Sequence, residues 1–373
     1  MYSESDLAGA VEAGAISPDA AAALRNHVAA SRSTPTVDEE SFRLLSGFND
    51  IFVGIASILI LVAVGWIGFY IGGKIIGLDA SEGPRQVGVA VAFGGFGVSI
   101  TSWLLAEYFT RQRRMALPSI LLLLGFAGGF FVGFGAIWGA NAPWISEQLG
   151  LTNELQHRQL AGGIGVVTGI VTAGVTWLHW RRFMVPITVA VGALALVAVA
   201  VGAVTAFVPA SQEALNPMLL IAGALVFVFA MRWDMSDRER RTRRSDVAFW
   251  LHLAAAPLIA HPVFHMLGVF EGPVSGPVAG VVIALYVFFA GVALAVDRRA
   301  LLVSSLVYVL WAMYALFEQS GAVELAAALT ALVIGSALLT LSAFWQPMRR
   351  QVVGLLGSGI GGRLPPTQQL AIA

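Results

Sequence analysis

The chain has 373 residues, of which 57% are hydrophobic and only 12% are charged, and its mean hydropathy is +0.79. Soluble globular proteins carry charge on roughly a quarter of their residues, so this composition excludes a water-soluble protein with a single core. The 22 Lys and Arg residues balance the 22 Asp and Glu residues, which leaves no basic field for nucleic acid, and the lack of cysteine excludes disulfides, thiolate metal sites and a cysteine nucleophile.

The chain begins with a polar segment, residues 1–46, for which the sequence predicts a cytoplasmic helical hairpin and a linker. Helices are expected over Glu4–Ala13 and Pro18–Ala30, because a capping Ser, a Pro and an Asp follow one another where the second helix starts. A polar linker is expected at residues 31–40. Two roles stay open for the hairpin: an element that docks a protein partner or mediates oligomerisation, or a lid on neighbouring loops.

Ten apolar segments follow within residues 47–345. A helix needs about 20 mainly apolar residues to cross the ~30 Å hydrocarbon core of a bilayer. We therefore predict an all-α, polytopic transmembrane helix bundle of about ten spans: Ile51–Ile76, Val87–Phe109, Met115–Ala140, Leu160–Trp180, Met184–Val208, Pro217–Met231, Val247–Gly268, Val278–Val296, Leu301–Phe317 and Val323–Trp345. Residues 346–373 are rich in Gly and Pro and are predicted to form a flexible cytoplasmic tail.

The distribution of basic residues supports this count and sets the orientation. Short cytoplasmic loops are rich in Lys and Arg, and only Lys74, Arg85 and Arg158 among the 22 basic residues fall on the opposite side. Both termini are therefore predicted to be cytoplasmic. No cleavable signal pattern lies near Met1, so we expect the first span to be an uncleaved anchor in a bacterial cytoplasmic (inner) membrane.

Two resemblances follow from this layout. The segment Gly14-Ala15-Ile16-Ser17-Pro18-Asp19-Ala20, followed by a short helix, a polar linker and many spans, resembles a family of uncharacterised bacterial multi-span inner-membrane proteins of unknown function. That resemblance implies no catalytic residues. Ten spans with short loops are also similar in shape to ten-helix drug/metabolite transporters built from two five-helix halves, which would lie inverted in the membrane because five is odd.

Small residues recur every four positions in two spans, where they predict close helix packing. An alternative is a seam along which helices slide during transport. The positions are Gly125, Gly129 and Gly133 in the third span, and Ala161, Gly165, Gly169 and Ala173 in the fourth.

The seventh span, Val247–Gly268, carries three of the six histidines. His261 and His265 are four residues apart and share a face, a spacing that can bind a metal or relay protons, whereas His252 lies on about the opposite face. Glu318, near the outer end of the ninth span, is expected at a similar depth. We therefore predict an outward-half proton or cation site of His261, His265 and Glu318, with His252 also on the pathway; hydrogen-bonded structural histidines are the alternative.

Three other polar features have simpler interpretations. Glu107 and Arg111, four residues apart, predict an interfacial ion pair. His179 lies among tryptophans and arginines and is interpreted as part of an aromatic belt at the cytoplasmic boundary. The arginine-rich loop Arg232–Arg244 sets topology or binds anionic lipid.

The sequence leaves the biochemical activity open. No motif of a nucleotide-binding loop, a serine hydrolase, a zinc protease or a dinucleotide fold occurs, so an enzyme is not favoured and no cofactor is assigned. The leading hypothesis is an inner-membrane protein that moves or binds a small molecule or ion, with spans seven and nine lining the pathway. The alternatives are a non-transporting scaffold or regulatory protein, and a haem or metal redox protein. Assembly into a homo-oligomer is left open.

Overall fold

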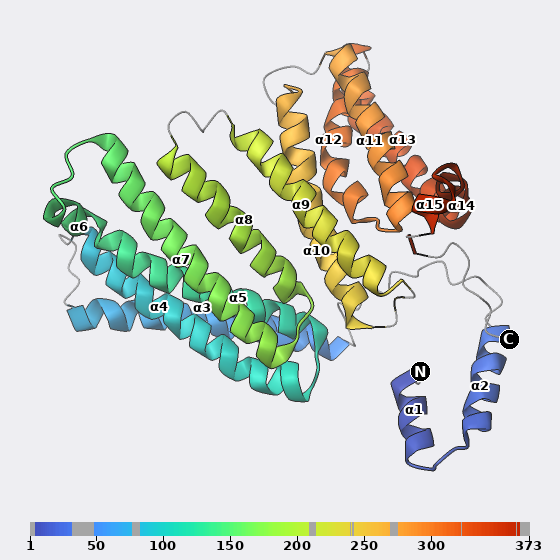
Figure 1. The fold of residues 1–373 in the computed structure, drawn as a ribbon, viewed down its shortest axis with the longest axis horizontal. Coiled ribbons are helices and arrows are strands. Elements are labelled where there is room, and N and C mark those ends of the chain that lie inside the picture. Colours follow the sequence, from blue (N-terminus) through green and yellow to red (C-terminus); the bar gives the residue numbers. More distant parts are fainter. Residues whose placement is uncertain are drawn as a thin grey trace. The chain divides into compact units, whose positions relative to one another are not determined.

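The computed structural model describes residues 4–31, 48–76, 83–208, 214–238, 240, 242–268, 275–321, 323–362 and 364–365. Every secondary-structure element in this part of the chain is a helix (Figure 1). The chain divides into two compact units, Met1–Phe42 and Arg43–Ala373. The predicted all-α class is therefore confirmed for the described residues.

The first unit contains the predicted hairpin of α1 (Glu4–Glu12) and α2 (Pro18–Ser31). The hydroxyl of Ser17 accepts a 3.1 Å hydrogen bond from the backbone N–H of Ala20, as expected for a helix cap. Beyond Ser31, the predicted linker lies outside the described residues.

Nine helices in the described ranges are long and apolar enough to cross a membrane, and each coincides with a predicted span. They are α3 (Phe48–Ile76), α4 (Pro84–Ala106), α5 (Ala116–Ala140), α7 (Glu154–Phe183), α8 (Ile187–Phe207), α9 (Leu215–Ser236), α10 (Arg243–Met266), α11 (Gly276–Val296) and α13 (Ala326–Ala343). Helix α12 (Ala300–Gln319) occupies the ninth predicted span. The total of ten spans stays a prediction.

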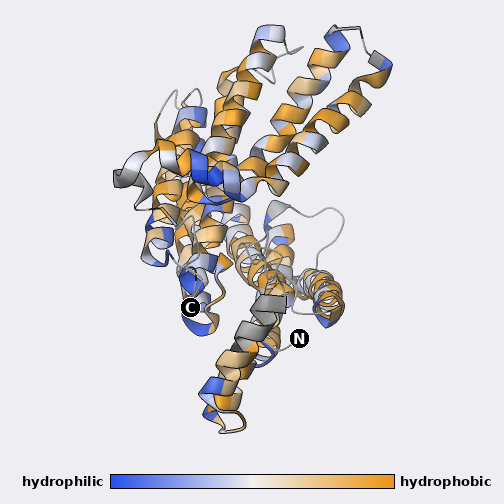
Figure 2. Ribbon diagram, turned by 90° about the vertical axis from the view of Figure 1, so that its right-hand side faces the viewer, coloured by the Kyte–Doolittle hydropathy of each residue, from blue (hydrophilic) through white to orange (hydrophobic). Residues whose placement is uncertain are grey.

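Apolar side chains on the outside of these helices fit contact with lipid. On α3, for example, Val62 is 67% exposed and Trp66 74% exposed. Figure 2 shows hydrophobic residues along most of each long helix and hydrophilic residues gathered at helix ends and loops. The protein is therefore an integral, multi-pass membrane protein.

Short helices connect or follow the long ones. They are η1 (Glu107–Gln112, a π-helix that continues α4), α6 (Ala142–Gln148), η2 (Val323–Leu325), α14 (Trp345–Leu355) and α15 (Gly357–Gly361). Apart from Trp345, helices α14 and α15 lie in the segment from residue 346 onward for which the sequence predicted a flexible tail. Trp345 and Arg349 lie one helical turn apart and are both buried, and Arg349 Nη2 donates a 2.6 Å hydrogen bond to the carbonyl of Pro365, so packing on one face orders this segment.

The predicted glycine packing is confirmed on α5 and only in part on α7. A Cβ on Gly129 would lie 2.6 Å from the carbonyl oxygen of Gly95, so α4 and α5 touch backbone to backbone. On α7, Gly169 meets the side chain of Val199 on α8, whereas Gly165 has nothing within 4 Å of its Cβ position.

The turns that carry most arginines lie together at one end of the second unit. The ion pair of Glu107 with Arg182 joins η1, which follows α4, to the last turn of α7. The ion pair of Asp234 with Arg298 joins the last turn of α9 to the turn after α11. Trp250, near the start of α10, packs against the cluster that contains Val185 and joins the two pairs. We call this the arginine-rich end, comprising residues 107–114, 181–186, 232–238, 240, 242–244 and 297–299.

Candidate functional site

Three ionisable side chains meet inside the bundle at the arginine-rich end. They are Asp234 in the last turn of α9, His252 in α10 and Arg298 just after α11, and their exposed fractions are 1%, 0% and 3%. His252 Nε2 lies 2.9 Å from Asp234 Oδ2. The Arg298 guanidinium donates to both carboxylate oxygens, through Nη2 at 2.5 Å and Nε at 3.2 Å, and Nη2 also reaches the carbonyl of Ser245 at 3.1 Å. We call these three residues the Asp–His–Arg cluster.

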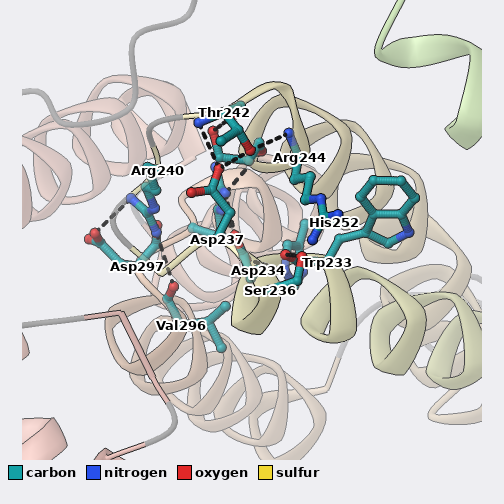
Figure 3. A network of polar contacts seen from close by, with 12 residues as sticks. Trp233, Asp234, Ser236, Asp237, Arg240, Thr242, Arg244, His252, Val296 and Asp297 are labelled. Atoms are coloured by element: carbon teal, nitrogen blue, oxygen red, sulfur yellow. Dashed lines mark hydrogen bonds and ion pairs between the residues drawn. The ribbon is translucent and has the colours of Figure 1, made fainter.

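Local structure in the α9–α10 turn brings Asp234 and His252 together. The carboxylate of Asp237 accepts hydrogen bonds from the backbone N–H and the hydroxyl of Thr242, at 2.9 Å and 2.7 Å, and the Thr242 hydroxyl in turn caps α10 (Figure 3). These contacts stabilise a turn that reverses the chain direction, so that α10 packs antiparallel to α9.

A left-handed residue at the end of α11 places the arginine. Asp297 has φ +60°, a conformation that Asp adopts more readily than most residues, and it turns the chain so that Arg298 follows directly. The end of α11 thereby contributes Arg298 to the buried site that Asp234 on α9 and His252 on α10 also form.

Asp297 itself is the centre of a second buried polar group. Its carboxylate accepts hydrogen bonds from Arg240 Nη1 at 2.9 Å and Trp345 Nε1 at 2.7 Å, and Arg349 Nε lies 3.5 Å away. Figure 3 shows Arg240 directed at Asp297 and the carbonyl side of Val296. Because Asp297 and Arg298 are neighbours in the chain, the two groups join the ends of α9, α10, α11 and α14.

A proton added to the Asp–His–Arg cluster would bind at a defined atom. Asp234 accepts hydrogen bonds from Arg298, so it acts as a carboxylate, and His252 must then donate to it through Nε2–H. The other ring nitrogen, Nδ1, is buried and has no hydrogen-bond partner in the described part of the chain. Since the charges of Asp234 and Arg298 cancel, a proton on Nδ1 would add one positive charge to the buried site.

The two outer histidines share a face of α10, as the sequence predicts, with ring centroids 6.2 Å apart. His261 Nδ1 lies 2.9 Å from the hydroxyl of Tyr308 on α12, and His265 Nδ1 lies 3.0 Å from the amide of Asn216 on α9. His252 lies nine residues before His261, about 13.5 Å along the helix at 1.5 Å per residue, and like His265 it contacts α9.

Glu318 is not grouped with these histidines in the part of the chain that the structure describes. No three His, Cys, Asp or Glu side chains gather closely enough to hold a metal ion within the described ranges. Tyr308 faces His261, and Glu318 lies ten residues farther along α12, which corresponds to about 15 Å and a different face. The site predicted from His261, His265 and Glu318, for a proton or a cation, therefore stays a prediction.

His179 is buried, which differs from the place that the sequence predicted for it. It is 0% exposed and surrounded by Trp103, Phe126 and Phe183, whose ring centroids lie 6.1, 5.4 and 4.6 Å from its own. Neither of its ring nitrogens has a partner among the described residues. The predicted place in a boundary belt is wrong, since α7 turns this side chain toward α4 and α5.

Two members of the Asp–His–Arg cluster were not predicted as site residues. Asp234 lay beyond the predicted end of the sixth span at Met231, and Arg298 was counted only as a topology signal. An acid that follows an apolar segment at helical spacing could have suggested that α9 extends farther. By contrast, the predicted ion pair of Glu107 with Arg111 is confirmed at 3.3 Å.

Comparisons with protein-family models, curated proteins and solved structures found no match to this chain.

Proposed function

We propose that the protein is a proton-coupled transporter of a small molecule or ion, and that His252 is the residue that binds the proton. The observation that carries this proposal is the buried, unpartnered Nδ1 of His252 beside the Asp234–Arg298 pair. Ionisable groups within membrane spans are costly and occur mostly where they serve ion or substrate pathways. Histidine is the side chain whose charge ordinarily changes between pH 5 and 8.

The proton would act through the contacts that hold the helix ends together. A protonated His252 carries a positive charge next to Arg298, and its Nδ1–H needs an acceptor. Both effects favour a different arrangement of α9, α10 and α11, because Arg298 bonds both Asp234 on α9 and the carbonyl of Ser245 on α10. Binding of one proton would thereby shift the population between two packing states.

For the protein as a whole, we propose the membrane topology that the sequence predicts. It comprises ten spans, with α12 as the ninth, both termini in the cytoplasm of a bacterium and the arginine-rich end facing inward. The resemblance in shape to ten-helix drug/metabolite transporters supports a transport role. His261, His265 and Glu318 would then lie in the outer half of the protein.

The experiment uses full-length protein in phospholipid vesicles. Tryptophan fluorescence is followed from pH 5 to pH 8 for the wild type, for His252→Gln and for a control, His157→Gln, whose histidine pairs with Ser146 outside the cluster. We expect a pH-dependent transition that His252→Gln abolishes and His157→Gln retains. An unchanged transition in His252→Gln would contradict the proton site.

Transport is tested separately in vesicles loaded with a mixture of small metabolites under an imposed pH gradient. Mass spectrometry of the external medium should show at least one solute whose release depends on the protein, on the gradient and on His252. If no solute moves, the transporter proposal fails even where the proton transition is present.

A scaffold or regulatory role is the second candidate. It is favoured by the N-terminal hairpin, which forms a compact unit of its own. In that case, the full chain should capture a protein partner, or a second copy of itself, that a chain lacking residues 1–46 does not. A haem protein, the remaining alternative, would show strong visible absorption after purification.

A further inference from the structure

A long apolar groove lies between α7, α8 and α9 in the half of the bundle near the arginine-rich end. Its volume is about 620 Å³, within the range of ligand sites. Helix α8 packs extensively on α7, and α9 on α10, while α8 and α9 touch only lightly. The groove is the space left where these two helix pairs diverge.

The dimensions of the groove match one leaflet of a bilayer. Along α8 its lining extends from Thr188 to Ala200, and along α9 from Trp233 to Ala222. At 1.5 Å per residue these stretches are about 17 Å long, close to half of the ~30 Å hydrocarbon core. Gly192 faces this space, since a Cβ there would have nothing within 4 Å.

Polar and aromatic groups are concentrated at one end of the groove. Trp177, Trp180 and Trp233 line it toward the arginine-rich end, where indole rings suit the level of lipid headgroups. Thr188 also lines it there; its side chain is 2% exposed, and its hydroxyl has no hydrogen-bond partner in the described ranges. Such a hydroxyl is available to donate to an acceptor that a bound molecule supplies.

A cation lies at the same end. The guanidinium carbon of Arg181 is 5.0 Å from the centre of the Trp177 ring, and the side chain is exposed. The neighbouring Arg182 binds Glu107 at 2.7 Å, so that carboxylate is held by another arginine. The open end of the groove is therefore positively charged.

We infer that the groove binds a phospholipid with an anionic headgroup. One acyl chain lies along α8 and α9, an ester carbonyl accepts a hydrogen bond from the Thr188 hydroxyl, and the headgroup phosphate pairs with Arg181. Acyl chains match an apolar groove of this length, and anionic lipids are attracted by cations at the membrane surface. This inference depends on the membrane character of the protein and not on the proposed proton site.

The test uses the full-length protein in vesicles of phosphatidylcholine mixed with phosphatidylglycerol, followed by gentle extraction and native mass spectrometry of bound lipid. We expect retained phosphatidylglycerol in the wild type. Gly192→Leu fills the groove and should remove most of the bound lipid, whereas Gly202→Leu, at an equally open position of α8 outside the groove, should not. Arg181→Gln should lower the preference for phosphatidylglycerol over phosphatidylcholine about fivefold.

The matched control for the arginine is Arg113→Gln. Arg113 also lies over an aromatic ring at the arginine-rich end, 5.4 Å from the centre of Tyr108, but outside the groove. Its substitution should leave the lipid preference unchanged. Equal lipid retention by Gly192→Leu and the wild type would overturn the site, as would a bound molecule whose mass is not that of a phospholipid. An unchanged preference in Arg181→Gln, which alters only a surface side chain, would overturn the assignment of the headgroup.

Discussion

Removal of the Asp234 carboxylate should strongly destabilise the second unit. Asp234→Ala leaves Arg298, 3% exposed, without the carboxylate that both its donors reach, and leaves His252 Nε2–H without an acceptor. Breaking a buried ion pair by removing one partner costs about 3–5 kcal/mol, because the remaining charge is not compensated. We expect the free energy of unfolding to fall by that amount, measured by chemical unfolding of the full chain in detergent.

A paired variant separates this electrostatic cost from the loss of side-chain volume. Replacing all three residues of the Asp–His–Arg cluster by apolar ones, with Asp234→Leu, His252→Leu and Arg298→Met, should restore stability to within about 1 kcal/mol of the wild type or above it. The same triple variant should lose the pH transition. Asp246→Ala, at an exposed acid in the first turn of α10, serves as the control and should cost less than about 1 kcal/mol. If Asp234→Ala is no less stable than this control, the cluster is not the closed, buried ion pair described above.

Three further predictions concern packing, the C-terminal segment and topology. Gly129→Ala should destabilise the protein by about 1–3 kcal/mol in the same unfolding assay, because its Cβ would meet the backbone of α4 at 2.6 Å, whereas Gly165→Ala should be neutral or stabilising; equal effects would contradict the packing. Trp345→Phe removes a 2.7 Å hydrogen bond to a buried carboxylate and should cost about 1–3 kcal/mol, with earlier proteolysis of residues 346–365 as a second measure. In the cysteine-free chain, an impermeant maleimide applied to intact cells should label Leu149→Cys and not Arg244→Cys; the reverse pattern would invert the predicted orientation.

Several features of the site could be predicted from local sequence and several could not. The shared face of His261 and His265 follows from helix geometry alone, and it is confirmed. The partners of these histidines do not follow, because Tyr308 and Asn216 are 47 and 49 residues away in the chain. The depth of Glu318 relative to them was estimated from span ends, whereas the contact of His261 with Tyr308 lies ten residues before Glu318 on α12.

The sequence by itself determined that the chain is a bundle of membrane-spanning helices, because the length and hydropathy of an apolar segment are local properties that lipid selects directly. Each of the nine helices confirmed as candidate spans was predicted from that signal. The tertiary structure decided which charges are buried. Asp234 meets His252 across 18 positions and Arg298 across 64, and Trp345 meets Asp297 across 48. Such contacts depend on how antiparallel helices align at one end of the bundle, and the hydropathy of a single segment carries no information about that alignment.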